Sequence, residues 1–417
     1  MSTPAPAQTS APTRSHRPAL MLTLATIGFA VNFWAWALVS PLGPGLKESL
    51  DLTSFQQALV VAVPVIVGAL GRIPVGALTD RYGGRIMFPV VSLTAVLPVL
   101  YLGIAGTETL AGVLVGGFFL GIAGTAFAVG VPFVSAWFPP ERRGTAIGIF
   151  GAGMGGTAIS ALTTVRLTDN FSTATPFLIT AGVLVAYGTV AALVLRDAPG
   201  RAAPSGSLAH RLGQTLRLRI TWQASALYAL AFGGYVAFSV YLPTYLKTAY
   251  SLDPTDAANR MAGFVLVAVV MRPVGGFLSD RVGPVPVLGA AFGLVTVGAA
   301  LAAFTPDLMP IGTVTFLTLA AALGVGSGAT FALVAQRAPA TMVGSVTGLV
   351  GAAGGLGGFI PPLLMGSIYG RWSDYGLGLA LLAGMAALAT VYTLTAVRRV
   401  GTGAGGAGAG QPAVVRS

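Results

Sequence analysis

The sequence predicts an all-α membrane protein with twelve transmembrane helices arranged as two pseudo-symmetric halves of six. Three observations lead to this prediction. First, the 417-residue chain has a mean hydropathy of +0.82 and only 8% charged residues, whereas soluble domains typically contain about 25%. Second, twelve apolar runs are long enough to cross a bilayer. Third, motifs of the first half recur in the second half at a constant spacing.

The twelve apolar runs define the order of the predicted elements. The longest polar connection, residues 196–221, is predicted to be a cytoplasmic linker between two six-helix bundles, 19–195 and 222–397. The Pro-, Ser- and Thr-rich residues 1–18 and the Gly-rich residues 398–417 are predicted to be flexible cytoplasmic ends. The predicted spans are 19–40, 53–78, 86–106, 109–136, 144–164, 175–195, 222–246, 260–279, 285–304, 310–333, 343–369 and 376–397.

The placement of basic residues predicts the orientation of these spans. If the N-terminus is inside, the inner segments carry 16 Lys and Arg residues and the outer loops carry 5. Such an excess is typical of cytoplasmic loops, so both termini are predicted to face the cytoplasm, with the chain in the cytoplasmic (inner) membrane. This topology also accounts for the net charge of +11, and nucleic acid is therefore not an expected partner.

Two arginines remain once every other charge is assigned to a loop or a span end. All 12 acidic residues and 21 of the 23 basic residues lie in such places, which leaves Arg72 and Arg272 deep in the membrane. Arg72 is eight residues, or about 12 Å of helix, from the polar end of its span at Asp80. A charge at that depth costs about 3 kcal/mol or more and by default marks a functional site.

The two arginines occupy equivalent positions of an internal repeat. The segment "GRIPVGALTDRYGG" (71–84) matches "MRPVGGFLSDRVGP" (271–284), and "GTAIGIFGAGMGG" (144–156) matches "GSVTGLVGAAGGLGG" (344–358), both with an offset of 200. Parallel repeats of this kind form transporters whose substrate site lies between the halves, near the membrane midplane. Arg72 and Arg272 are therefore predicted to face one another across a central cavity.

The unpaired arginines predict a small planar anion as the ligand, because the predicted spans contain no carboxylate to pair with them. A guanidinium group is planar and presents forked donors that can bind an oxyanion through two hydrogen bonds. Nitrate and nitrite suit two facing forks. Phosphate and sulfate carry more charge and favour further cations, whereas a hydrated halide lacks the shape.

Other function classes find little support in the sequence. "GAGMGG" (151–156) satisfies G-x-G-x-x-G, but it lacks the preceding strand and the downstream acid of a dinucleotide site, so a small-residue face for helix packing is the better interpretation. The sequence has no cysteine and no H-E-x-x-H or G-x-S-x-G motif. No cofactor, metal site or enzymatic activity is predicted; a membrane-bound enzyme or an anion sensor is the alternative from another class.

The repeat around Arg72 resembles the loop motif of the major facilitator superfamily, in which Gly…Asp-Arg-x-Gly links the second and third spans of a half. The resemblance implies the major facilitator fold and a monomer. It also implies a cytoplasmic gate, held by charge and helix-end contacts of Asp80 and Arg81 and of their repeats Asp280 and Arg281.

A more specific resemblance, to the nitrate/nitrite porter family, covers essentially every span. It rests on "VNFWAWALVSPLGPGL", on the paired arginines and on the signatures "FGAGMGGTAISAL" and "GAAGGLGGFIPPLLMG". The resemblance implies that Arg72 and Arg272 clamp the anion, and that Phe127 of the fourth span and Tyr228 and Phe232 of the seventh pack around it.

The glycine signatures add three residues to the implied substrate site: Gly151, Gly351 and Met154. Met154 stands where many family members have an asparagine that can hydrogen-bond the anion, so the choice of substrate depends on this position. A further polar residue, Asn32 of the first span, is predicted either to line the cavity or to bond a neighbouring helix.

The charge distribution favours exchange of nitrate for nitrite over proton-coupled uptake. No carboxylate or histidine lies within the predicted spans to carry a proton. A cell interior negative by about 100 mV opposes net anion uptake by about 2.3 kcal/mol per charge. Proton-coupled nitrate symport is one alternative. Transport of another small or organic anion, such as cyanate or a nitro-aromatic acid, is the other, and Met154 motivates it.

Overall fold

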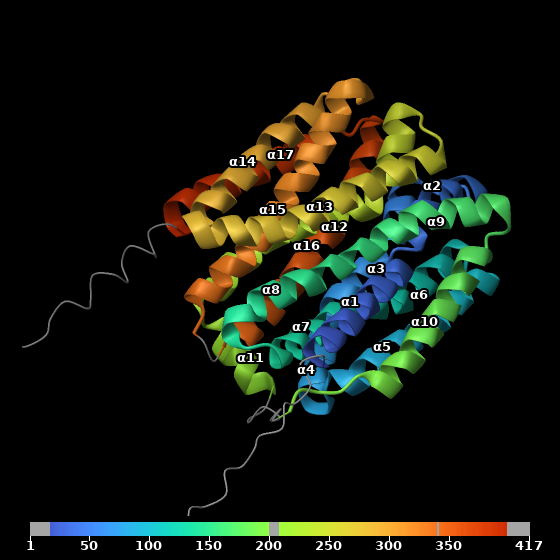
Figure 1. Ribbon diagram of the computed structural model, residues 1–417. Coiled ribbons are helices and arrows are strands. Elements are labelled where there is room, and N and C mark those ends of the chain that lie inside the picture. Colours follow the sequence, from blue (N-terminus) through green and yellow to red (C-terminus); the bar gives the residue numbers. More distant parts are fainter. Residues whose placement is uncertain (1–16, 200–207, 340–341, 398–417) are drawn as a thin grey trace, which may run out of the picture.

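The structure, a computed structural model, describes residues 17–199, 208–339 and 342–397. Twelve helical segments within these ranges are long and apolar enough to cross a membrane, which confirms the predicted number of spans. They form two bundles that lie side by side (Figure 1). Residues 1–16 and 398–417, which the sequence predicts to be flexible, lie outside the described ranges.

The first half contains six spans, several of which are broken into shorter helical pieces. The second span changes helix at Gly71, and the fourth and fifth pass through short 3₁₀ stretches at the small-residue segments 121–125 and 152–155. Such stretches inside long helices often mark hinges. The helices of this half are α1 (Arg17–Trp36), α2 (Val39–Ser49), α3 (Ser54–Leu70), α4 (Arg72–Tyr82), α5 (Gly84–Tyr101), η1 (Leu102–Gly106), α6 (Leu110–Leu120), η2 (Gly121–Thr125), α7 (Ala126–Trp137), α8 (Pro140–Gly151), η3 (Ala152–Gly155), α9 (Gly156–Asn170) and α10 (Thr175–Val194).

The second half repeats this plan with longer continuous helices. Its helices are α12 (Arg219–Tyr250), α13 (Pro254–Val282), α14 (Pro284–Ala303), η4 (Leu308–Gly312), α15 (Thr313–Arg337), α16 (Val343–Trp372), α17 (Gly376–Tyr392) and η5 (Thr393–Val397). The repeat extends to the backbone at the turn between the second and third spans. Gly83 and Gly283 have φ values of +88° and +89°, which glycine adopts without steric cost.

The linker differs from the plain connection that the sequence predicts. Residues Leu208–Leu216 form a further helix, α11, and α12 begins at Arg219, three residues before the predicted start at 222. Two hydrogen bonds join α11 to α12, from Thr221 Oγ1 to the Thr215 carbonyl (2.7 Å) and from Trp222 Nε1 to the Leu216 carbonyl (2.8 Å). A helix of nine residues is too short to be found by a search for membrane spans.

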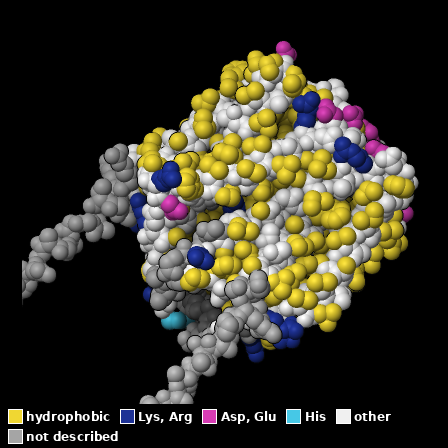
Figure 2. Space-filling view, in the orientation of Figure 1, with side chains coloured by type: hydrophobic (Ala, Val, Ile, Leu, Met, Phe, Trp, Pro, Cys, Tyr) yellow, Lys and Arg dark blue, Asp and Glu magenta, His cyan; other side chains and the backbone are white. Residues whose placement is uncertain are grey.

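The two ends of the bundle can be distinguished by the path of the chain. Because each half has six spans, the start of α1, the helix α11 and the end of η5 lie at one end, which we call the linker side (Figure 1). The opposite end, where α2 and α12 finish, is called the far side. Figure 2 shows hydrophobic side chains covering the flank of the bundle, with charged side chains gathered toward its two ends, as expected for a lipid-facing surface.

The halves contact each other mainly through α16 against α3, α13 against α9 and α12 against α2. Apart from those made by the two buried arginines, the hydrogen bonds that join fully described residues of the two halves lie between the arginines and the far side. They are Ser40 Oγ to the Val240 carbonyl (2.7 Å), Gln57 Nε2 to Thr244 Oγ1 (3.1 Å), the hydroxyls of Thr157 and Tyr235 (3.2 Å), Arg166 Nη2 to Asn259 Oδ1 (2.8 Å) and Lys247 Nζ to Glu48 Oε1 (2.5 Å). The halves are therefore joined on the far side in this structure.

Candidate binding site between the halves

Arg72 lies at the point where the second span is broken. It is the first residue of α4, directly after Gly71, and only 6% of its surface is exposed. Its Nη1 donates to the carbonyl of Gly351 in the other half (2.7 Å), and its Nε lies 3.4 Å from the carbonyl of Gly124. The guanidinium thus reaches across the interface between the halves.

Arg272 occupies the equivalent position in the second half, inside α13, and is 8% exposed. Its Nη2 donates to the hydroxyl of Tyr228 (2.9 Å), and its Nη1 contacts the sulfur of Met154, which belongs to the first half. Both arginines therefore contact a residue of the opposite half.

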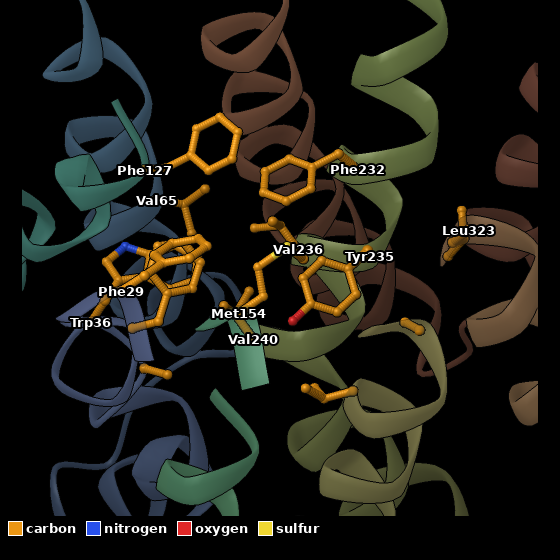
Figure 3. Close-up of a cluster of buried hydrophobic side chains, with 14 of the residues drawn as sticks. Phe29, Trp36, Val65, Phe127, Met154, Phe232, Tyr235, Val236, Val240 and Leu323 are labelled. Atoms are coloured by element: carbon orange, nitrogen blue, oxygen red, sulfur yellow. The ribbon is translucent and has the colours of Figure 1, made fainter. Parts of the chain in front are cut away.

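Aromatic rings connect the two arginines. Arg72 Cζ lies 5.2 Å from the centre of the Phe127 ring and 5.5 Å from that of Phe232, and Arg272 Cζ lies 6.0 and 5.8 Å from the same two rings. Tyr228 stacks on Phe232 with ring centres 4.9 Å apart. Figure 3 shows Phe127 and Phe232 in one cluster of buried side chains with Met154 and Tyr235. The predicted residues of the site thus lie together at the interface.

The groups that bond the two guanidiniums are neutral. Carbonyl oxygens, a phenol and a thioether accept their hydrogen bonds, and neither arginine is ion-paired with an acid among the described residues. A buried charge without a counter-charge is costly, and two close together also repel each other. The arrangement is therefore electrostatically complementary to an anion.

Gly151 and Gly351 belong to opposite halves, and both border this cluster. A Cβ atom added at Gly351 would lie 3.2 Å from Cε1 of Phe127, and one added at Gly151 would lie 3.9 Å from Nε of Arg272. Glycine at 351 allows its backbone to approach both Phe127 and Arg72. Glycine at 151 is less tightly constrained.

Phe331 of α15 is a member of the cluster that the sequence did not indicate. Its ring centre lies 5.5 Å from Arg272 Cζ and 4.7 Å from the centre of the Tyr228 ring. No motif surrounds Phe331, and an isolated phenylalanine in a span is most often a packing residue. Only the fold brings it to the arginines.

The four residues of the expected gate lie apart from the arginines, on the linker side. Asp80 and Arg81 are in the last turn of α4, and Asp280 and Arg281 are in the last turn of α13. The Arg281 guanidinium lies 4.3 Å from the centre of the Phe277 ring on its own helix. Eight residues of helix, about 12 Å, separate each Asp from the arginine of its span.

Asn32 bonds a neighbouring helix, which is one of the two predicted alternatives. It is fully buried, and its Nδ2 donates to Ser92 Oγ of α5 and to the Gly28 carbonyl, both at 2.8 Å. The bond to Ser92 ties α1 to α5 within the first half.

Comparison with known proteins identifies the family. The model of the Major Facilitator Superfamily matches residues 25–362 and 224–416. A protein of Mycobacterium tuberculosis named probable nitrate/nitrite transporter NarK2 is 50% identical over 378 residues, which cover 89% of this chain and 95% of that protein. The chain belongs to the nitrate/nitrite porter family of the major facilitator superfamily.

Two further similarities bear on the family and on the fold, respectively. The nitrite extrusion protein of Bacillus subtilis is 35% identical over 376 residues, covering 89% of this chain and 92% of that protein. A crystal structure of a bacterial homolog to the human lysosomal transporter Spinster matches the fold with a TM-score of 0.71 at 18% identity, covering 92% of this chain and 98% of that one. The predicted family and the predicted fold are both confirmed.

Proposed function

We propose that this protein exchanges nitrate for nitrite by alternating access, with the anion held between Arg72 and Arg272. The observation that carries the proposal is the pair of buried guanidiniums at the interface of the halves, bonded only to neutral groups among the described residues. The relatives are named as nitrate/nitrite and nitrite transporters, which supports nitrate and nitrite as the anions.

The donor geometry suits a flat oxyanion. Two forked guanidiniums can each offer two parallel N–H donors to such an anion, and charge-assisted bonds of this kind are roughly twice as strong as neutral ones. The edges of aromatic rings carry partial positive charge, so Phe127 and Phe232 can flank the anion between the arginines. To bind, the anion takes the place of weaker acceptors such as the Met154 sulfur.

Exchange follows from the charge of the empty site. With an anion bound, part of the repulsion between the two arginines is cancelled and the halves can close around it. Without an anion, closing brings two like charges together in a medium of low dielectric constant. The empty carrier therefore returns slowly, and transport in one direction requires transport in the other.

The remaining parts of the proposal concern orientation and gating. The protein lies in the inner membrane with its linker side facing the cytoplasm, in accordance with the excess of basic residues on that side. It works as a monomer. Asp80, Arg81, Asp280 and Arg281 form the gate on this side, at the ends of α4 and α13.

Counterflow in proteoliposomes tests the proposal. Vesicles are loaded with nitrite or left empty, and uptake of labelled nitrate is measured for the wild type, Arg72→Lys and Arg272→Lys. We expect uptake only with internal nitrite, and a fall of about tenfold to a hundredfold in either variant, because lysine replaces a fork by a point charge. Arg260→Lys is the matched control. Arg260 lies outside the arginine cluster and is ion-paired with Asp256 of its own half (3.1 Å), so the same change of residue type should not affect the anion site.

The other outcomes separate the alternatives. Uptake into empty vesicles that rises with an inward proton gradient would establish symport in place of exchange. Absence of nitrate uptake under both conditions would point to a different anion, and Met154→Asn would then be the first variant to compare.

A further inference from the structure

A second pair of cations follows the same register as the two arginines. Lys47, near the end of α2, and Lys247, near the end of α12, differ by 200 in number, as Arg72 and Arg272 do. Both lysines lie on the far side, and both are only partly exposed. The repeat thus carries one cationic pair at the centre of the interface and another at its far-side end.

The two lysines line one pocket. It has a volume of about 340 Å³, and its polar and charged lining consists of Lys47, Lys247, Glu48, Asp51, Gln57 and Thr248. Because residues of both halves contribute to it, the pocket is the mouth of the interface rather than a crevice within one bundle.

From the pocket, contacts between the halves lead toward the arginines. Gln57, in the pocket lining, donates to Thr244 Oγ1 (3.1 Å). Nearby, Ser40 Oγ donates to the carbonyl of Val240 (2.7 Å), and these two residues again differ by 200. A contact between equivalent residues marks the axis that relates the halves. The arginine pair bridges the same interface.

Lys247 is held by a carboxylate of the other half. Its Nζ pairs with Glu48 Oε1 at 2.5 Å, with side-chain exposures of 26% for Lys247 and 68% for Glu48. Asp51 is not ion-paired with either lysine. Among the described residues, the groups that contact the Lys47 ammonium are neutral: Ser54 Oγ at 3.4 Å and the Tyr369 ring at 5.9 Å. The Lys47 ammonium can therefore bind an anion. The ion pair of Lys247 is weakened by water, because Glu48 is 68% exposed.

We propose that Lys47 and Lys247 form a second binding site for a small monovalent oxyanion, at the far-side mouth, with Glu48 as its built-in competitor. This inference rests on the function proposed above and adds a step to it. An arriving anion takes the place of the Glu48 carboxylate against Lys247. Because Glu48 belongs to the first half and Lys247 to the second, the replacement removes an ion pair that joins the halves.

The chemistry of lysine suits a site that an anion occupies only briefly on its way to the arginines. An ammonium group is a compact point charge without a fixed fork, so it attracts anions without the shape selection of a guanidinium. The Lys47 ammonium, whose contacts among the described residues are neutral, also attracts an arriving anion locally. Binding at the mouth thus favours opening of the far side, after which the arginine pair selects the substrate.

The absence of cysteine from the sequence allows a direct test of this site. Thr248→Cys places one thiol in the pocket lining, and its modification by an anionic and by a cationic thiol reagent is measured on purified protein in lipid nanodiscs. Nitrate is added against gluconate at constant ionic strength. We expect nitrate to slow the anionic reagent in a saturable manner, because both compete for the lysines, and to slow the cationic reagent much less.

Variants in the Thr248→Cys background locate the effect. Lys47→Gln and Lys247→Gln should each remove most of the protection by nitrate, whereas Arg260→Gln, which removes a far-side cation outside the pocket, should leave it unchanged. Glu48→Gln should shift protection to several-fold lower nitrate. Asp51→Asn should shift it much less, because Asp51 is not ion-paired with the lysines.

The outcomes distinguish this inference from the proposed function. Nitrate transport without protection of the thiol introduced by Thr248→Cys, or equal effects of Glu48→Gln and Asp51→Asn, would overturn the second site and leave the exchanger intact. Protection that depends on both lysines, in a protein that does not transport nitrate, would support the second site while contradicting the function proposed for the first.

Discussion

Gly351 links Arg72 to Phe127, and its lack of a side chain is predicted to matter for binding. Its carbonyl accepts from Arg72 Nη1, and an added Cβ would lie 3.2 Å from Phe127 Cε1. Gly351→Ala should therefore displace the Phe127 ring from between the arginines. Since cation–π contacts contribute about 0.5–2 kcal/mol, we expect the KM for nitrate in counterflow to rise about twofold to thirtyfold.

The repeat supplies the matched control for this substitution. An added Cβ at Gly151 would be 3.9 Å from Arg272 Nε, an ordinary contact distance. Gly151→Ala should leave the KM close to that of the wild type. If both variants raise the KM equally, the effect comes from helix propensity or general crowding and not from Phe127.

At the scale of single residues, the sequence revealed the charges and the family signatures but not the whole cluster. Arg72 and Arg272 could be predicted because a charge in an apolar span has no ordinary explanation. Phe127, Tyr228 and Phe232 came from the family resemblance alone. Phe331 was missed because a phenylalanine in a membrane span looks the same whether it packs against lipid, core or an arginine.

The packing of α16 against α3 depends on Gly355, and a side chain there should slow transport. An added Cβ would lie 2.6 Å from Ala69 Cβ and 3.1 Å from Ala69 Cα, so α16 would have to move away from α3. Overpacking of this kind costs about 1–3 kcal/mol. Gly355→Ala should lower the Tm and the maximal exchange rate. Gly155→Ala, at the equivalent position with nothing within 4 Å, should change neither; a similar loss in both variants would contradict the packing explanation.

At the scale of elements, the number and order of spans were predictable, whereas their internal breaks were not. Length and hydropathy are enough to find twelve apolar runs. The break at Gly71 and the 3₁₀ stretches at 121–125 and 152–155 lie inside runs whose average hydropathy stays high, so a hydropathy search does not detect them. The helix α11 was missed for a related reason, because its nine residues are stabilised by contacts with α12 rather than by a long apolar sequence.

For the whole molecule, the offset of 200 allowed the arrangement of the halves to be anticipated. Equivalent residues of parallel repeats are related by one axis, so residues near the axis meet their own counterparts, as Ser40 and Val240 do. The sequence could not indicate on which side the halves are joined, because an alternating-access carrier uses one set of residues in two arrangements. Only the far-side bonds, such as Gln57 to Thr244, identify the arrangement seen here.

Alternating access requires these far-side contacts to separate, and a disulfide can test this. An added Cβ at Gly43 of α2 would lie 3.3 Å from Thr244 Oγ1 of α12, which is within reach of a disulfide between cysteines at the two positions. In this cysteine-free sequence, oxidation of Gly43→Cys/Thr244→Cys can form only that bond within the chain. We expect oxidation to abolish counterflow and reduction to restore it, while either single variant is unaffected by oxidant. Full exchange in the cross-linked protein would mean that α2 and α12 stay together during transport, and that the anion crosses the far side by another route.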